Sequence, residues 1–172
     1  RADRIASARY RFSVEAGDKK VAVLLSASLD GSVMHKSYEF FDDGLVCRYR
    51  LQGSAWRGFF STELNFNLLA PRSHDRYIEV VGRSIEPRYA ASRGVERGVD
   101  AVRVVDEQRG FAIAISLSDA ATFYRYPVET VSNSESGLER TYQCTSLVFL
   151  WSSGLLEGGL EITVKIERLK DG

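Results

Sequence analysis

Residues 126–151 read YPVETVSNSESGLERTYQCTSLVFLW. Runs rich in β-branched and aromatic residues begin and end this stretch, and residues of this kind favour strands. Between them, Ser132, Asn133 and Gly137 favour a turn, because short polar side chains bond the local backbone and glycine accepts positive φ. The stretch therefore predicts two β-rich segments joined by a loop or a sharp strand crossing.

Apolar and polar residues alternate along nearly the whole chain, as expected for strands. The expected strands cover residues 9–15, 20–29, 33–41, 45–51, 59–69, 77–81, 99–105, 111–117, 122–126 and 160–166. No stretch keeps a 3.6-residue period over three turns, so we expect about a dozen strands and no sizeable helix. This pattern predicts an all-β fold of two packed antiparallel sheets, a β-sandwich.

The first strands are expected to form hairpins. Asp30-Gly31 and Asp43-Gly44 predict tight turns with glycine at a positive φ, which gives a meander. Alternation within residues 9–15 places Tyr10, Phe12 and Val14 on one face of a half-buried strand.

Composition limits the classes of partner. The 172 residues contain 44% hydrophobic residues and 3 prolines, which is typical of a globular domain, so we expect residues 1–172 to form a single domain. Lys and Arg together number 23, as do Asp and Glu, so no global charge favours nucleic acid or an anionic membrane. Cys47 and Cys144 are expected to be small buried thiols, which favours a reducing, cytoplasmic location.

Few residues suit metal or hydrolytic chemistry. His35 and His74 have no partners at a zinc-site spacing, and no serine lies in a Gly-x-Ser-x-Gly context. Asp42, Asp43 and Asp75 offer oxygens to calcium without a recognisable spacing. We therefore expect no metal and no cofactor.

Residues 59–69 predict a strand with one polar and one apolar face. Glu63, Asn65 and Asn67 share the polar face. Amide and carboxylate groups in this pattern suit a buried network or a sugar-binding face, although the same face could simply meet water.

The stretch PVETVSNSESGLERTYQ, residues 127–143, resembles the signature PxETVSxSExGxERxYQG. This signature belongs to a C-terminal β-sandwich domain that follows the catalytic barrel in 4-α-glucanotransferases and α-amylases of glycoside hydrolase family 57. Residues 59–69 are similar to the F-x-x-E-x-N-x-x-L strand of the same family. The one departure is Cys144, where the family usually has glycine. The resemblance implies a galactose-mutarotase-like supersandwich excised from a longer chain with an N-terminal catalytic barrel.

In that family the nucleophile and the acid/base belong to the barrel, so the resemblance implies that none of the glutamates here is catalytic. It implies a non-catalytic accessory domain that packs against the barrel and contacts α-glucan or malto-oligosaccharide. The residues expected to contact sugar or the barrel are Trp56, Glu63, Asn65, Asn67, Glu129, Glu135, Glu139, Arg140, Tyr142 and Gln143.

Two other functions fit the sequence. A stand-alone mutarotase-like or lyase-like enzyme needs a general base and an acid within hydrogen-bond reach, so His35 or His74 would lie beside a glutamate. A purely structural interdomain module would bury the polar stretch in a network that binds nothing. An open cleft, a histidine–carboxylate pair or full burial distinguishes the three hypotheses.

Overall fold

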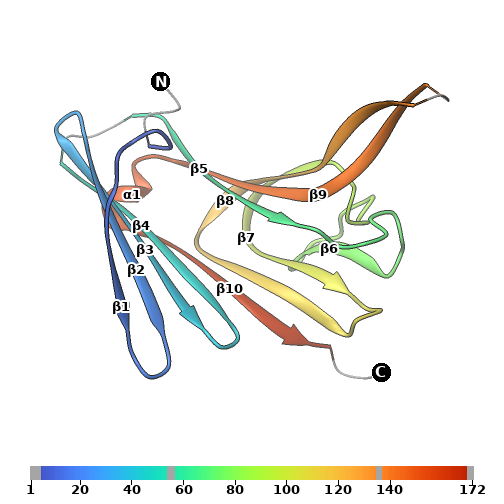
Figure 1. Ribbon diagram of the computed structural model, residues 1–172, viewed down its shortest axis with the longest axis horizontal. Helices are drawn as coiled ribbons and strands as arrows, with labels where there is room; N and C mark the ends of the chain where they lie inside the picture. The colour runs from blue at the N-terminus through green and yellow to red at the C-terminus, as the bar shows by residue number, and fades with distance from the viewer. Residues whose placement is uncertain (1–4, 54–56, 135–136, 170–172) are drawn as a thin grey trace.

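The computed structural model describes residues 5–53, 57–134 and 137–169 (Figure 1). Within these ranges the elements are β1 (Arg11–Ala16), β2 (Val21–Leu29), β3 (Ser32–Phe41), β4 (Gly44–Gly53), β5 (Phe59–Phe66), β6 (Arg76–Val80), β7 (Gly94–Asp106), β8 (Phe111–Ser134), β9 (Gly137–Ser152), α1 (Leu155–Gly158) and β10 (Leu160–Arg168). The described residues include one helix of 4 residues. None of them forms a helix long and apolar enough to cross a membrane.

The strands form one continuous antiparallel sheet that folds over into two packed layers, which we call the first and the second sheet. Strands pair in the order β1-β2-β3-β4-β10-β8-β7-β6, while β9 pairs with β8 and β5 pairs with β9. Residues 111–117 of β8 pair with β10, and residues 122–134 pair with β9. β8 thus passes from one layer into the other, as strands do at the corners of packed sheets, and β7 follows it by pairing with both parts of β8. The predicted antiparallel β-sandwich is confirmed.

The core lies between the two sheets. On β4, Cys47, Tyr49 and Leu51 are buried, and the residues between them are exposed. Aromatic rings continue this core into the second sheet: the ring centroids of Phe60 and Trp151 lie 6.2 Å apart. Rings at this separation add about 0.5–1.5 kcal/mol beyond their burial. The apolar residues that alternate with polar ones in the sequence of β4 are therefore the ones that form the core.

Ten strands are found in the described ranges, fewer than the dozen or so expected. Residues 111–117 and 122–126 were predicted as two strands, but both belong to β8, which continues through the polar stretch to Ser134. Residues 118–121, between these two ranges, remain extended and form no loop. There, the hydroxyl of Ser118 bonds Asp119 and accepts the backbone N–H of Glu161.

Both predicted hairpins form, but only one of them has glycine at a positive φ. At the β2–β3 turn Asp30 and Gly31 have φ of 41° and 85°, the left-handed conformation that a two-residue hairpin requires. The β3–β4 turn consists of Asp42 and Asp43, because Gly44 pairs with Phe41. Gly44 does not have a positive φ, so that part of the prediction is wrong. Glycine serves a different purpose here, since a Cβ on Gly44 would lie 2.2 Å from the carbonyl oxygen of Val164 on β10.

The prediction that the first strand is half-buried holds for Tyr10, which packs against the core before β1 begins, but it is wrong for β1 itself. All six residues of β1 are exposed, with Phe12 and Val14 at 73% and 56%. β1 is an edge strand that pairs only with β2, and its apolar side chains therefore remain open to solvent.

Candidate functional site

The polar stretch forms an arm that projects from the body of the sandwich (Figure 1). We define the arm as residues 127–134 of β8 and 137–145 of β9. Their antiparallel pairing continues to Ser134 opposite Gly137. Thr and Val at 128, 130, 131 and 141 favour the extended backbone, which explains why a segment predicted as a loop forms a hairpin.

A bulge separates the arm from the sheet. Val128 pairs with Cys144, but the next residue, Glu129, pairs with Tyr142, so that Gln143 has no partner across the ladder. An extra residue of this kind bends the strand and increases its twist. It also places Tyr142 on the same face as Thr145, three residues away.

On one face of the arm, a carboxylate joins two strands and a loop. An Oε of Glu129 lies 3.5 Å from Arg140 Nη1 and 3.9 Å from Arg93 Nη2. The side chain of Glu129 is 18% exposed, whereas both guanidinium groups belong to side chains that are 68% exposed. Ion pairs this exposed stabilise a fold by less than about 1 kcal/mol, so their arginines can bond other partners.

Tyr142 anchors the base of the arm. Its hydroxyl lies 2.6 Å from Thr145 Oγ1 and 3.4 Å from the carbonyl oxygen of Phe66. Thr145 Oγ1 in turn donates to the carbonyl of Ala90 at 2.6 Å. Burial raises the pKa of Tyr142 above its usual value. The ring is half-buried, and its hydroxyl ties the arm to β5.

Gln143 and Glu139 lie on the opposite face of the arm from Glu129. Gln143 Nε2 donates to Thr130 Oγ1 at 3.1 Å, and Glu139 is exposed opposite Ser132. These side chains are open to solvent, and their amide and carboxylate groups are available to a partner.

The polar face of β5 is exposed, as its alternation allows. Glu63 Oε1 accepts a 2.7 Å hydrogen bond from the buried hydroxyl of Ser146, and Asn65 Oδ1 lies 3.6 Å from Cys144 Sγ. Asn67, beyond the end of β5, is exposed. Across the sheet Ser146 pairs with both Asn65 and Tyr126, which places the tyrosine beside this polar row.

The structure therefore divides the expected contact residues into three groups. Glu129, Arg140 and Tyr142 lie on one face of the arm, and Glu139 and Gln143 lie on its other face. Glu63 and Asn65 lie on the outer face of β5, and Asn67 follows the end of that strand. Trp56 and Glu135 lie outside the described residues.

Sequence reasoning missed Arg125, which is 2% exposed. Its guanidinium donates to Ser92 Oγ at 3.0 Å, to the carbonyl of Pro87 at 3.2 Å and to Glu96. A Cβ on Gly94 would collide with it. The signal in the sequence was the spacing: Arg125 is two residues from Phe123, so both side chains point to the same, apolar side of β8.

Neither histidine forms a hydrogen bond or ion pair with a carboxylate within the described ranges. His35 Nε2 lies 3.2 Å from Gln52 Oε1, and His74 is exposed on the loop before β6. In the same part of the chain, no group of three or more His, Cys, Asp or Glu side chains is arranged to hold a metal ion.

The fold and this geometry have counterparts among known proteins. The family described as alpha-amylase/4-alpha-glucanotransferase, C-terminal, matches residues 5–166. The chain belongs to this family. Its membership confirms the resemblance carried by residues 127–143.

Relatives show how the domain is used in longer chains. Alpha-amylase 1 of Dictyoglomus thermophilum is 30% identical over 154 residues, which are 87% of this chain and 22% of that protein. The chain thus spans about a fifth of the length of this curated relative. The crystal structure of 4-alpha-glucanotransferase from Thermococcus litoralis matches with a TM-score of 0.58 at 21% identity, covering 92% of this chain and 22% of the other.

A third match bears on the fold alone. A protein from Escherichia coli K12 assigned as an aldose 1-epimerase superimposes with a TM-score of 0.62 at 10% identity, covering 94% of this chain and 69% of the other. This likeness supports the mutarotase-like sandwich that the family resemblance implied.

Proposed function

We propose that this C-terminal domain is a non-catalytic accessory domain of an α-glucan-active enzyme, and that the arm docks on the catalytic domain of the same chain. The observation that carries the proposal is the arm itself, which projects from the sandwich with apolar side chains open to solvent (Figure 1). Val128, Val131 and Leu138 are 37%, 57% and 78% exposed. Exposed apolar residues gathered on one projection are typical of a docking surface.

The polar groups on the arm complement this apolar surface. Glu129 and Arg140 pair on one face, while Glu139 and Gln143 lie open on the other. An interface needs an apolar centre with a polar rim, and the arm supplies both. Because the arm projects beyond the sandwich core, it can contact a neighbouring domain without a change in the strands of the core.

Contact with glucan is a further part of the proposal. Sugar sites combine aromatic faces with amide and carboxylate groups that bond hydroxyls. Tyr126 is 37% exposed and pairs with Ser146, whose other neighbour is Asn65. Glu63 accepts the Ser146 hydroxyl and keeps one carboxylate oxygen for a ligand. This row is the surface on which we place malto-oligosaccharide.

The two other functions have weaker support. A mutarotase-like or lyase-like enzyme would use a histidine beside a carboxylate, but His35 contacts Gln52. A purely structural module is supported by Tyr142, whose hydroxyl is engaged within the protein. The exposed Glu139, Gln143 and Leu138 favour the docking arm over a fully buried network.

We also propose that the chain is one domain of a longer cytoplasmic protein with an N-terminal catalytic barrel. The 22% share of the relatives' length supports the first part. Cys47 and Cys144 are free thiols, buried and half-buried respectively, and free thiols favour a reducing compartment.

Docking is tested in the longer enzyme by replacing Val131 and Leu138 with aspartate. Val14→Asp is the matched control, because Val14 is 56% exposed on β1, far from the arm (Figure 1). We expect the arm variant to lose most of its activity on malto-oligosaccharides and to separate the unfolding transitions of the two domains. The control should behave as the wild type. Equal behaviour of the two variants would contradict docking through the arm.

Glucan contact is tested by calorimetric titration with maltoheptaose. Calorimetry measures binding without a chromophore at the sugar, and Trp151 is buried in the core. We expect Glu63→Gln and Asn65→Ala to weaken binding, while Arg72→Gln, on an exposed loop, leaves it unchanged. A titration without heat in both the isolated domain and the longer enzyme would favour the structural module.

A further inference from the structure

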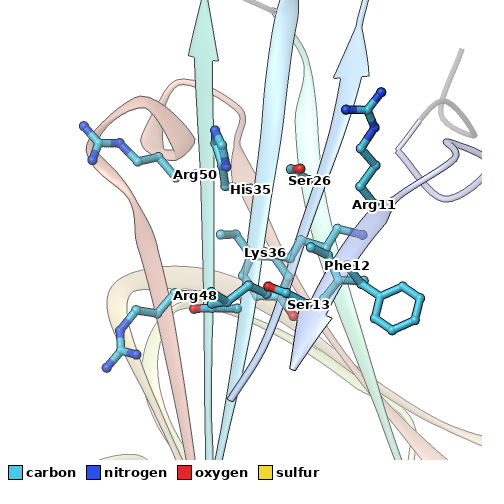
Figure 2. Close-up of a pocket in the computed structure, with 12 residues that line it drawn as sticks. Arg11, Phe12, Ser13, Ser26, His35, Lys36, Arg48 and Arg50 are labelled. Carbon is cyan, nitrogen blue, oxygen red and sulfur yellow. The ribbon is translucent and has the colours of Figure 1, made fainter. Parts of the chain in front are cut away.

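A second surface lies on the first sheet, away from the arm. A groove of about 460 Å³ runs across β1, β2, β3 and β4 (Figure 2). Tyr49 is buried in the core, so its neighbours Arg48 and Arg50 point to the opposite, outer face. The groove therefore lies on the side of the sheet that the second sheet does not cover.

Strand register arranges the groove in two rows. Arg11 pairs with Ser26, Ser26 with His35, and His35 with Arg50. The same pairings give the second row, which consists of Ser13, Leu24, Ser37 and Arg48. His35 and Ser26 lie between the two arginines of the first row in Figure 2. The register of the first four strands thus places an arginine at each end of the first row and the Ser26 hydroxyl between them.

The groove is cationic although the whole chain carries no net charge. Its lining includes arginine, lysine and histidine, and no aspartate or glutamate. One of these cations is already engaged, and Lys36 faces away from the two rows. Arg48 pairs with Glu39 at 3.0 Å and with Glu161 at 2.7 Å. Lys36 pairs with Tyr49 across the strands and so points to the core face, where its ammonium lies 4.3 Å from the ring centroid of Tyr10.

Arg11 and Arg50 differ from these residues. Both are exposed, and neither has a carboxylate or hydrogen-bond partner in residues 5–53, 57–134 and 137–169. Strands lie about 4.8 Å apart, so three steps separate the two backbones by about 14 Å, which two arginine side chains can span from either side. Their guanidinium groups are available to one ligand placed over Ser26 and His35.

We propose that this groove binds a phosphate monoester carried by a sugar. The planar guanidinium fork matches phosphate oxygens in a bidentate manner, and its bonds to an anion are charge-assisted. The second row supplies what a sugar needs, with hydroxyls from Ser13 and Ser37 and an apolar surface from Leu24, which is 37% exposed. The volume of the groove lies within the range of small-molecule sites.

The site is independent of the arm and of the enzyme activity proposed for the longer chain. It lies on β1–β4, and the arm projects from the opposite side of the molecule in Figure 1. Its failure would leave the docking proposal intact, and the reverse also holds.

The test is calorimetric titration of the protein with glucose 6-phosphate, with glucose and inorganic phosphate as separate ligands. We expect Arg11→Gln and Arg50→Gln each to weaken glucose 6-phosphate binding about tenfold, since each removes a charge-assisted bond. Arg72→Gln is the control, because Arg72 is also exposed. All the changes are on the surface, and circular dichroism confirms that the variants fold.

The ligands separate the outcomes. Tighter binding of glucose 6-phosphate than of inorganic phosphate, with glucose silent and amide NMR shifts confined to β1–β4, supports the proposal. Equal affinity for glucose 6-phosphate and inorganic phosphate would overturn the assignment to a sugar ester. Absence of heat, or an unchanged affinity in the Arg11→Gln/Arg50→Gln double variant, would overturn the site itself.

Discussion

At the scale of single residues, one buried cation organises the irregular segment between β6 and β7. Arg125 bonds the carbonyl of Pro87 and Ser92 of that segment, and also Glu96 near the start of β7. Burying a guanidinium is costly unless each donor finds an acceptor and the charge is paired. Polar contacts of Arg125 therefore hold the segment against β8. The neighbouring inward-facing residue of β8, Phe123, is buried by apolar packing instead.

Replacing Arg125 by methionine should destabilise the domain by about 3–5 kcal/mol, because it leaves the carboxylate of Glu96 without its partner. The control is Arg93→Ala, which removes an exposed ion pair and should cost less than about 1 kcal/mol. Urea unfolding followed by circular dichroism measures both. Adding Glu96→Gln to Arg125→Met should recover part of the loss, and equal losses in Arg125→Met and Arg93→Ala would contradict this account.

At the scale of elements, the alternation of apolar and polar residues predicted the strands that have one buried face and one exposed face. On β4 the residues Cys47, Tyr49 and Leu51 alternate with arginines, and the structure buries the first set and exposes the second. β8 was harder, because its polar end has no apolar face and reads as a loop. Pairing with β9 makes it a strand, and that hairpin pairing is not visible in the alternation of β8 alone.

The candidate site was predictable in its residues and not in its geometry. The signature in residues 127–143 identified the arm, but strict alternation would place Tyr142 with Cys144. The bulge at Gln143 instead brings Tyr142 to the face of Thr145. A bulge is an extra residue in one strand of a pair, so a single strand's sequence does not reveal it.

The close approach of β4 to β10 gives a prediction at this scale. Gly44→Ala should destabilise the domain by about 1–3 kcal/mol, because the new methyl group meets the backbone oxygen of Val164, which cannot rotate away. Gly17→Ala is the control, since the nearest atom to its Cβ is 3.7 Å away and the change should be within about 1 kcal/mol. Thermal unfolding compares the two, and equal shifts would mean that β10 moves to accommodate the methyl group.

At the scale of the whole molecule, the sandwich has one sheet that extends beyond the other. The apolar residues of β1 pair with apolar residues of β2, Phe12 with Leu25 and Val14 with Val23, yet Phe12 and Val14 remain exposed. β1 also has one edge free of pairing among the described strands. An exposed apolar edge strand promotes self-association.

Changing Phe12 and Val14 to lysine should therefore reduce concentration-dependent association without lowering the thermal midpoint, since both side chains are exposed in the fold. Ser13→Lys, on the other face of β1, is the control and should have a smaller effect. Sedimentation velocity over a range of concentrations measures the change. Identical sedimentation of the wild type and the double variant would show that this edge does not drive association.

The 24 residues of β8 run through both sheets, with β10 as a neighbour near one end and β9 near the other. The hydrogen-bonding partners of β8 are divided between the two layers, so we expect the two layers to unfold together. Cutting the polypeptide within residues 118–121 would not release two autonomous halves, and fragment complementation, if it occurs, would have to rebuild both layers in a single cooperative step.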